Sequence, residues 1–203
     1  MRSTWLACGF LLVTSALAAQ APEHRWRLQI GTALEAFGGA SADTSTIAGT
    51  EVEVRPASRL AFAAGLHRRW GAWEAGVELG YGSGALRAVT DELQLDDRTA
   101  DVTRYRAALL LGRRLAHLGS ATLTLLGGPA VDHWELGGYG GRTTFAVQAG
   151  LALRFPLGNR VEFEHRVFGG LGGSPFRRET LPPEAEIRSL RTLGVGAGLR
   201  IGL

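Results

Sequence analysis

Three scarcities in the sequence exclude whole classes of function. Cysteine occurs once among 203 residues, at Cys8, inside a segment that we expect to be removed, so the mature chain has no disulfide and no thiolate nucleophile. After residue 18 no run of eighteen apolar residues occurs, which excludes a transmembrane helix. Lysine is absent, and the arginines are spread along the chain instead of forming the basic stripe that nucleic-acid binding requires, so we expect no nucleic-acid partner.

The first eighteen residues have the composition of a secretory signal peptide. A basic start, Met1-Arg2-Ser3, precedes a mostly apolar run from Trp5 to Leu17, and Ala16-Leu17-Ala18 is a small-x-small cleavage site. Cleavage after Ala18 is favoured over Ala21, because Pro22 would follow the second scissile bond. We therefore expect a signal peptide over 1–18, a short segment over 19–23 and one folded domain over 24–203.

The rest of the chain contains eight segments in which apolar residues alternate with other residues. This period of two is typical of strands with two different faces. The segments are 26–36, 60–66, 73–81, 105–111, 121–125, 145–155, 161–167 and 193–203. The fifth segment loses its phase near Leu126, and Pro129 predicts a bulge there.

The connections between these segments differ in length from one side to the other. Short turns are expected at Gly71-Ala72, at Leu118-Gly119 and at Leu157-Gly158-Asn159. Long connections are expected at 38–57, 83–101 and 171–187, with a shorter one near 137–141. Short turns on one side and long loops on the other are typical of bacterial outer-membrane barrels, whose termini both lie on the short-turn, periplasmic side. The pattern predicts an all-β fold, an eight-stranded antiparallel up-and-down transmembrane β-barrel.

Aromatic residues gather at both ends of the predicted strands. Such girdles flank the apolar band of a barrel in a bilayer. Trp26, Trp70, Trp73 and Phe155 are expected at the short-turn end, and Phe37, Tyr81, Tyr105 and Trp134 at the loop end.

The composition of the less apolar strand face distinguishes a soluble barrel from a membrane barrel. A soluble lipocalin-like barrel would turn its apolar residues inward, with polar residues in water. Here the other face is mainly Gly, Ala and Thr with isolated Arg and Glu, which suits the crowded lumen of a narrow barrel. The short turns also predict cross-strand pairs. These are Trp70 with Trp73 and Leu153 with Phe163 outside, and Arg69 with Glu74 and Arg154 with Glu162 inside.

The last strand is expected to pair with the first, so that the chain end is held in a closed barrel. Leu193, Val195, Leu199 and Ile201 would then face lipid, with Arg200 and the glycines facing inward. The stretch 198–203 resembles the C-terminal assembly signal of outer-membrane proteins, with Leu203 in place of the usual aromatic residue. This resemblance implies the outer-membrane barrel assembly machinery as a partner.

Over 24–203 the pattern resembles the small eight-stranded outer-membrane barrels typified by OmpA and OmpX. The resemblance is one of architecture, and it implies insertion from the periplasm into the outer membrane of a Gram-negative bacterium. The partners it implies are outer-membrane lipid and lipopolysaccharide. No periplasmic domain is expected, because nothing follows the eighth strand.

Eight strands enclose a lumen that side chains fill, so a general diffusion porin is not expected. The inward charges either neutralise one another in a plugged interior, which we favour, or line a narrow ion path. These charges are Glu78, Arg104, Arg106, Glu162, Glu164 and Arg166.

One residue on the predicted lipid face raises the possibility of an enzyme. Phe163-Glu164-His165 resembles the catalytic stretch of outer-membrane lipid A deacylases, in which a lipid-facing histidine is followed two positions later by a nucleophilic serine. This sequence has Val167 at that position, and valine offers no nucleophile to activate. The resemblance keeps a lipid A deacylase as the alternative, and we expect no catalytic residue.

Polar residues near the loop end are candidates for metal or lipid contact. Asp132-His133 are adjacent on a strand and so point to opposite faces, which favours a polar rim over a metal site. An acidic stretch matches no defined calcium motif and predicts a solvated loop; its members are Asp91, Glu92, Asp96, Asp97 and Asp101. Arg177 and Arg178 are candidates for lipopolysaccharide phosphates. We therefore expect no cofactor or metal, and a non-enzymatic structural, adhesion or ligand-contact role through loops 38–57, 83–101 and 171–187.

Overall fold

The computed structural model describes residues 25–39, 41–43, 52–89, 94–137, 140–181 and 185–203. The predicted signal peptide and the segment 19–23 lie outside these residues. Among the described residues, no helix has the length and apolar character needed to span a bilayer. The elements are β1 (Trp26–Gly38), β2 (Ser41–Asp43), β3 (Val52–Pro56), β4 (Arg59–Trp70), β5 (Trp73–Val89), β6 (Gln94–Leu118), β7 (Ala121–Leu136), β8 (Gly140–Pro156), β9 (Val161–Gly172), the 3₁₀ turn η1 (Arg178–Thr180), β10 (Ala185–Ile187) and β11 (Leu190–Gly202).

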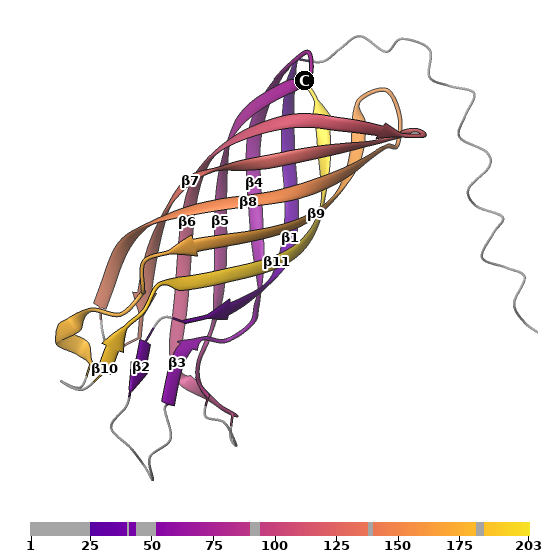
Figure 1. Cartoon of the computed structure of the whole chain (residues 1–203). Helices are drawn as coiled ribbons and strands as arrows, with labels where there is room; N and C mark the ends of the chain where they lie inside the picture. The colour runs from indigo at the N-terminus through magenta and orange to yellow at the C-terminus, as the bar shows by residue number, and fades with distance from the viewer. Residues whose placement is uncertain (1–24, 40, 44–51, 90–93, 138–139, 182–184) are drawn as a thin grey trace, which may run out of the picture.

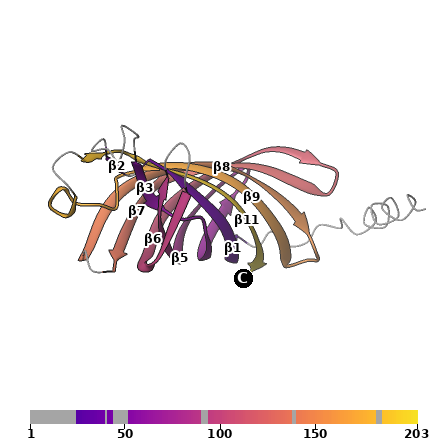
Figure 2. The ribbon, with the colours of Figure 1, turned by 90° about the horizontal axis from the view of Figure 1, so that it is seen from below.

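Eight long antiparallel strands close into a ring (Figure 1). The order around the ring is β1-β4-β5-β6-β7-β8-β9-β11, and β11 returns to pair with β1 from Arg27↔Gly202 to Gly38↔Arg191. The backbone amide of Leu203 also donates to the carbonyl of Trp26 at 3.1 Å, so the chain end is held. Each of the eight predicted segments lies in one of these strands, except that Leu203, the last residue of the eighth segment, follows the end of β11. Figure 2 shows the slant that is typical of barrel strands. The eight-stranded prediction is confirmed.

Three tight turns and the C-terminus lie at one end of the ring, which we call the turn end. Gly71 and Gly119 have positive φ values of 59° and 63°, a conformation that suits glycine in a tight turn. The opposite end, the loop end, carries the longer connections. Connection 38–57 contains β2 and β3, and connection 171–187 contains η1 and β10.

The connection predicted over 83–101 is shorter than predicted, because strands occupy most of this range. β5 continues to Val89 and β6 begins at Gln94, so most of this stretch is a hairpin projecting beyond the ring, with one register shift after Ala85. β3 pairs with the same part of β5, and β2 and β10 extend this side sheet. A third strand stabilises a hairpin that would be marginal alone, which explains why this polar, acidic sequence forms strand.

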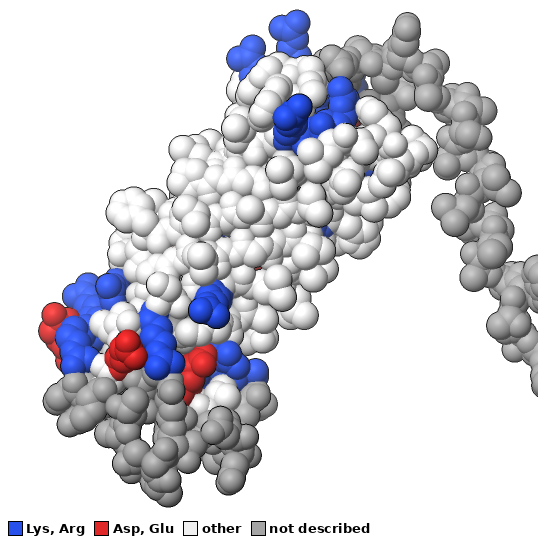
Figure 3. Space-filling model, in the orientation of Figure 1, with Lys and Arg blue, Asp and Glu red and all other residues white. Residues whose placement is uncertain are grey.

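Apolar side chains cover the outside of the ring and charged ones lie inside it. Phe62, Leu151 and Val195 are 54%, 46% and 57% exposed, whereas Glu78 and Arg106 are 6% and 8% exposed. Figure 3 shows a broad band of uncharged atoms between two charged ends. A lipocalin-like barrel would show the reverse arrangement, so the prediction of an outward apolar face is confirmed.

The bulge predicted at Pro129 is wrong. β7 pairs with β8 in one unbroken register, and Leu126 keeps the phase of the strand by pointing inward. The irregularity lies in the neighbouring strand β6, between Arg114 and Ala116. The lumen accepts Leu126 because Leu110 and several alanines make that part of the interior apolar.

Of the two predicted turn registers, one is confirmed and one is wrong. Arg69 faces Glu74 and Trp70 faces Trp73, as the Gly71-Ala72 turn predicts. Between β8 and β9, however, Arg154 faces Glu164 instead of Glu162, and Leu153 faces His165 instead of Phe163. The turn is centred one residue later than predicted and is closed by the amide of Leu157 donating to the carbonyl of Val161. Such a shift moves the register by two, which preserves the inside and outside faces.

Candidate functional site in the barrel lumen

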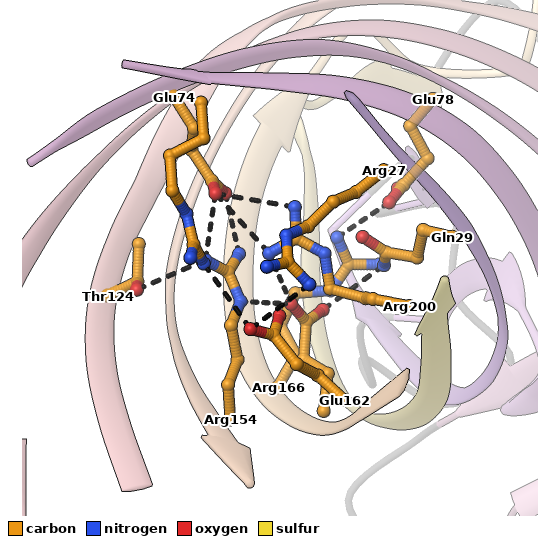
Figure 4. A network of polar contacts seen from close by, with 11 residues as sticks. Arg27, Gln29, Glu74, Glu78, Thr124, Arg154, Glu162, Arg166 and Arg200 are labelled. Carbon is orange, nitrogen blue, oxygen red and sulfur yellow. Dashed lines mark hydrogen bonds and ion pairs between the residues drawn. The ribbon is translucent and has the colours of Figure 1, made fainter. Parts of the chain in front are cut away.

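The half of the lumen near the turn end is filled by a network of ion pairs (Figure 4). We define the turn-end network as Glu74, Arg154, Glu164 and Arg200, which come from four different strands. Arg154 donates to both carboxylate oxygens of Glu74 at 2.6 and 2.8 Å, and through Nε to Glu164 at 2.7 Å. Arg200 adds two contacts of 3.3 Å to Glu74. Two guanidinium groups and two carboxylates thus balance one another.

Further polar side chains extend this network along the barrel. Gln29 donates to Glu164 at 3.1 Å, and Thr124 accepts from Arg154 at 3.2 Å. Glu162 lies 3.2 Å from a guanidinium nitrogen of Arg27 and 3.6 Å from one of Arg69. Next along the lumen, Arg166 donates to Glu78 at 2.7 Å.

The half near the loop end contains a second group of charges. We define the loop-end cluster as Glu35, Arg59, Arg104, Arg106 and Asp132, all of them buried. Arg106 makes a two-bond contact with Asp132 at 2.7 and 2.8 Å and donates a third bond to Gln148 at 3.0 Å. Glu35 pairs with Arg104 and, at 3.5 Å, with Arg59.

An apolar group closes the lumen above this cluster. We define the apolar cap as Phe37, Leu86, Val102, Trp134, Leu136, Phe176 and Leu190, which form one buried cluster. Phe37 and Trp134 meet edge to face, with ring centroids 6.0 Å apart. The guanidinium groups of Arg59 and Arg104 lie 4.9 to 5.5 Å from both ring centroids, within the range of cation–π attraction.

This cap corrects the predicted loop-end girdle. Phe37 and Trp134 are buried in the lumen because they have the same strand phase as Glu35 and Asp132. Tyr81 and Tyr105 do lie outside, with ring centroids 5.5 Å apart. At the turn end the prediction holds for the tryptophans Trp26, Trp70 and Trp73, which are all exposed.

The described side chains leave little free space in the lumen. Cavities of about 10 to 30 Å³ remain between them, and the 30 Å³ cavity lies among Glu35, Arg104, Arg106 and Arg166. The smallest cavity that holds a water is about 10–15 Å³. The interior therefore has room for isolated small species of the size of water, between inward charges that are mostly engaged in ion pairs.

The sequence predicts the inward position of these charges but not their partners. Every residue of the proposed ion path lies in the lumen in an ion pair. Most of these pairs join strands that are not neighbours, as with Glu78 on β5 and Arg166 on β9. Glu35 and Arg59 were not among the predicted lumen charges, and Asp132 was predicted only as part of a polar rim, although the strand phase of all three identifies them as inward.

His165 lies on the outer face of β9 without a nucleophile beside it. Its ring meets that of Phe163 edge to face at 4.7 Å, and Val167 is exposed two residues further along the same face. The cross-strand partners of His165 among the described residues are Ala197 and Leu153, neither of which has a hydroxyl to activate.

The remaining polar candidates do not assemble into a metal site. Asp132 and His133 point to opposite faces, as predicted, but Asp132 belongs to the lumen and not to a polar rim. His133 instead shares a hydrogen bond of 2.9 Å with Thr143 on the outside. Across the described ranges, no group of three or more His, Cys, Asp or Glu side chains is arranged to hold a metal ion.

The described part of the acidic stretch and the arginine pair lie at the loop end. Asp91 and Glu92 fall outside the described residues, whereas 96, 97 and 101 belong to β6 instead of the predicted solvated loop. Arg177 and Arg178 are exposed and donate to the backbone carbonyls of Gly141 and Ala185, respectively. Their contact with lipopolysaccharide stays a prediction.

Comparison with known proteins finds the same architecture in outer-membrane proteins. No protein-family model matches the chain, and no curated protein sequence matches it. The fold is similar to that of Neisserial surface protein A, with a TM-score of 0.62 and 10% identity over 88% of this chain and 97% of that protein. It is also similar to the outer-membrane protein OprG from Pseudomonas aeruginosa, with a TM-score of 0.50 and 14% identity over 87% and 94% of the two chains.

These likenesses and the exposed apolar band lead to the same conclusion. An antiparallel barrel with lipid-compatible side chains outside and paired charges inside is the architecture of transmembrane β-barrels. The chain has the fold of the small eight-stranded outer-membrane β-barrels typified by OmpA and OmpX, and its exposed apolar band fits a bilayer.

Proposed function

We propose that the protein is a non-enzymatic outer-membrane barrel that acts through the surface of its loop end, by adhesion or by contact with an extracellular ligand. The filled lumen carries this proposal. Ion pairs occupy the half near the turn end and the apolar cap closes the other half. The described side chains therefore leave neither a pore nor a binding chamber of substrate size between them. The loop-end surface then remains for recognition.

The loop end has the chemistry that such contacts use. Figure 3 shows arginine and acidic side chains gathered there, on the far side of the uncharged band from the turn end. Arg177, Glu179 and Glu186 are among the exposed charges of connection 171–187. Lipopolysaccharide is the neighbour that we expect this surface to meet first, because its phosphates suit guanidinium groups.

Two double variants, each lacking one pair of adjacent arginines, test the contact with lipopolysaccharide. Binding of lipopolysaccharide to the full-length protein in detergent micelles should weaken several-fold in the R177A/R178A variant. The R113A/R114A variant removes an equivalent pair at the turn end and should bind as the wild type does. Equal binding by all three proteins would exclude a contact through Arg177 and Arg178.

The two alternative functions have direct assays. A channel would produce discrete conductance steps in planar bilayers, and we expect none from the wild-type protein. A deacylase would release fatty acid from lipid A and lose that activity in the H165A variant. We expect no release, because Val167 replaces the nucleophile.

Assembly in the membrane belongs to the same proposal. Export by residues 1–18 would deliver the chain to the periplasm, and the stretch 198–203 would then present Leu199, Ile201 and Leu203 to the barrel assembly machinery. These three side chains lie on the outer face and have the alternating spacing of the assembly signal.

A further inference from the structure

The loop-end cluster contains one more positive charge than negative charge. Arg59, Arg104 and Arg106 are buried there with only two carboxylates, those of Glu35 and Asp132. Glu78, which lines the cavity of about 30 Å³ beside this cluster, is already paired with Arg166. By contrast, the four residues of the turn-end network are balanced. Beside them Arg27 and Arg69 share Glu162, but their side chains are 11% and 19% exposed, so water reaches that extra charge. The surplus charge that is fully buried lies under the apolar cap.

Among the side chains that the structure describes, nearby acids do not supply the missing charge. Glu53, on β3, is engaged by Arg55 at 3.2 Å and by the backbone amide of Gly39 at 2.9 Å. Asp101 and Glu135 are exposed at the loop end. An unbalanced charge in a low-dielectric interior is costly unless a counterion compensates it.

Unused hydrogen-bond donors accompany this surplus. Nη2 of Arg59, Nη1 of Arg104 and Nε1 of Trp134 are buried and have no acceptor within the described part of the chain. All three residues are more than nine-tenths buried. Buried N–H groups are satisfied in nearly all native proteins, by protein or by a bound molecule, so these donors indicate a missing acceptor.

A cavity of suitable size adjoins Arg104, one of the residues with an unused donor. It measures about 30 Å³, and its lining includes Arg104, Arg106, Arg166 and Gln148. This space accepts a single small monovalent ion and excludes larger organic anions. Two members of the apolar cap, Phe37 and Trp134, lie against Arg104 on the loop side.

We propose that the lumen binds one small monovalent anion of the halide class, held beside Arg104 beneath the apolar cap. The anion neutralises the surplus guanidinium charge and accepts from the unused Nη1 group of Arg104, which lines the cavity. It is a structural ion that enters as the barrel forms, and this role is independent of any loop-end ligand.

Bromide provides a direct probe because it scatters anomalously. Crystals of the full-length protein grown in detergent with sodium bromide should show one anomalous peak in the cavity beside Arg104. At equal ionic strength, the wild-type barrel should be more stable in bromide or chloride than in gluconate. At halide concentrations above the dissociation constant, each tenfold increase should lower the unfolding equilibrium constant tenfold.

Two arginine variants separate this site from general effects of salt. In the R104Q variant Glu35 keeps Arg59 and Asp132 keeps Arg106, so the cluster becomes neutral and should lose both the peak and the halide dependence. The R27Q variant is the matched control, because Glu162 keeps Arg69, and both signals should persist.

The wild-type measurements decide the proposal even where a variant fails to fold. Equal stability in gluconate and bromide, together with no anomalous peak in the lumen, would show that water alone fills the cavity and would overturn the proposal. A bromide peak that persists in R104Q would also overturn it.

Discussion

Glu74 holds the turn-end network together, and its neutralisation tests whether buried charges set the stability of this barrel. It accepts four contacts, two from Arg154 at 2.6 and 2.8 Å and two from Arg200 at 3.3 Å. The exposed fractions of these three residues are 3%, 2% and 0%. In the Glu74→Gln variant both guanidinium groups stay buried, with only Glu164 to balance them.

Removing one partner of a buried ion pair costs about 3–5 kcal/mol, because the remaining charge stays desolvated. We expect a loss of this size in the free energy of unfolding of the Glu74→Gln barrel. The exposed pair of Glu186 and Arg188, with side chains 65% and 39% exposed, provides the control. The Glu186→Gln change should cost about 0–1 kcal/mol, since solvent screens such pairs.

Urea titration of the barrel in phospholipid vesicles measures both variants, with the folded fraction read from tryptophan fluorescence and from gel migration before and after boiling. The double variant E74Q/R200Q restores charge balance and should be more stable than the sum of the two single changes predicts, by about 0.5–3 kcal/mol. If Glu74→Gln unfolds at the same urea concentration as Glu186→Gln, the lumen charges do not stabilise the barrel and the reasoning is refuted.

Three further changes test other parts of the structure by the same titration. Arg154→Lys should cost about 1.5–3 kcal/mol, because a point charge replaces a fork that bridges two carboxylates, whereas Arg188→Lys should have no measurable effect. Gly76→Ala would place a methyl carbon 2.4 Å from His67 Nδ1 and should cost about 1–3 kcal/mol, whereas Gly158→Ala meets no atom within 4 Å and should be neutral. Val195→Arg, in the middle of the apolar band, should cost about 2–4 kcal/mol, whereas Leu118→Arg at the turn end should cost about 0–1 kcal/mol. Equal stability within any of these pairs would contradict the corresponding assignment.

The faces of the strands are predictable from sequence because a period of two leaves only two choices. Once Leu151 and Val195 are assigned to lipid, every residue of the opposite phase is assigned to the lumen. The same rule places Phe37 and Trp134 inside, together with Glu35 and Asp132. The predicted loop-end girdle was wrong for these two aromatics. The prediction considered only how close Phe37 and Trp134 lie to the strand end, and did not consider which face of the strand they occupy.

The partners of the lumen charges are not predictable in the same way. A tight turn fixes which residues of adjacent strands face each other, as for Arg69 and Glu74. Yet Glu74 contacts Arg154 and Arg200 across the barrel, while Arg69 lies against Glu162. Contacts of this kind depend on the strand tilt and stagger of the closed ring, which local sequence does not determine.

The absence of lysine has a structural reason in this lumen. A guanidinium group has five N–H donors in a planar fork, so one arginine can serve two carboxylates and a hydroxyl, as Arg154 does with Glu74, Glu164 and Thr124. A lysine ammonium is a compact and more strongly hydrated charge, which makes it more costly to bury and less able to bridge fixed partners. A narrow barrel with a charged interior therefore favours arginine at every inward basic position. The same property leaves Arg59 and Arg104 with donors to spare, so a lumen built from arginine can bind an anion that a lumen built from lysine would hold less well.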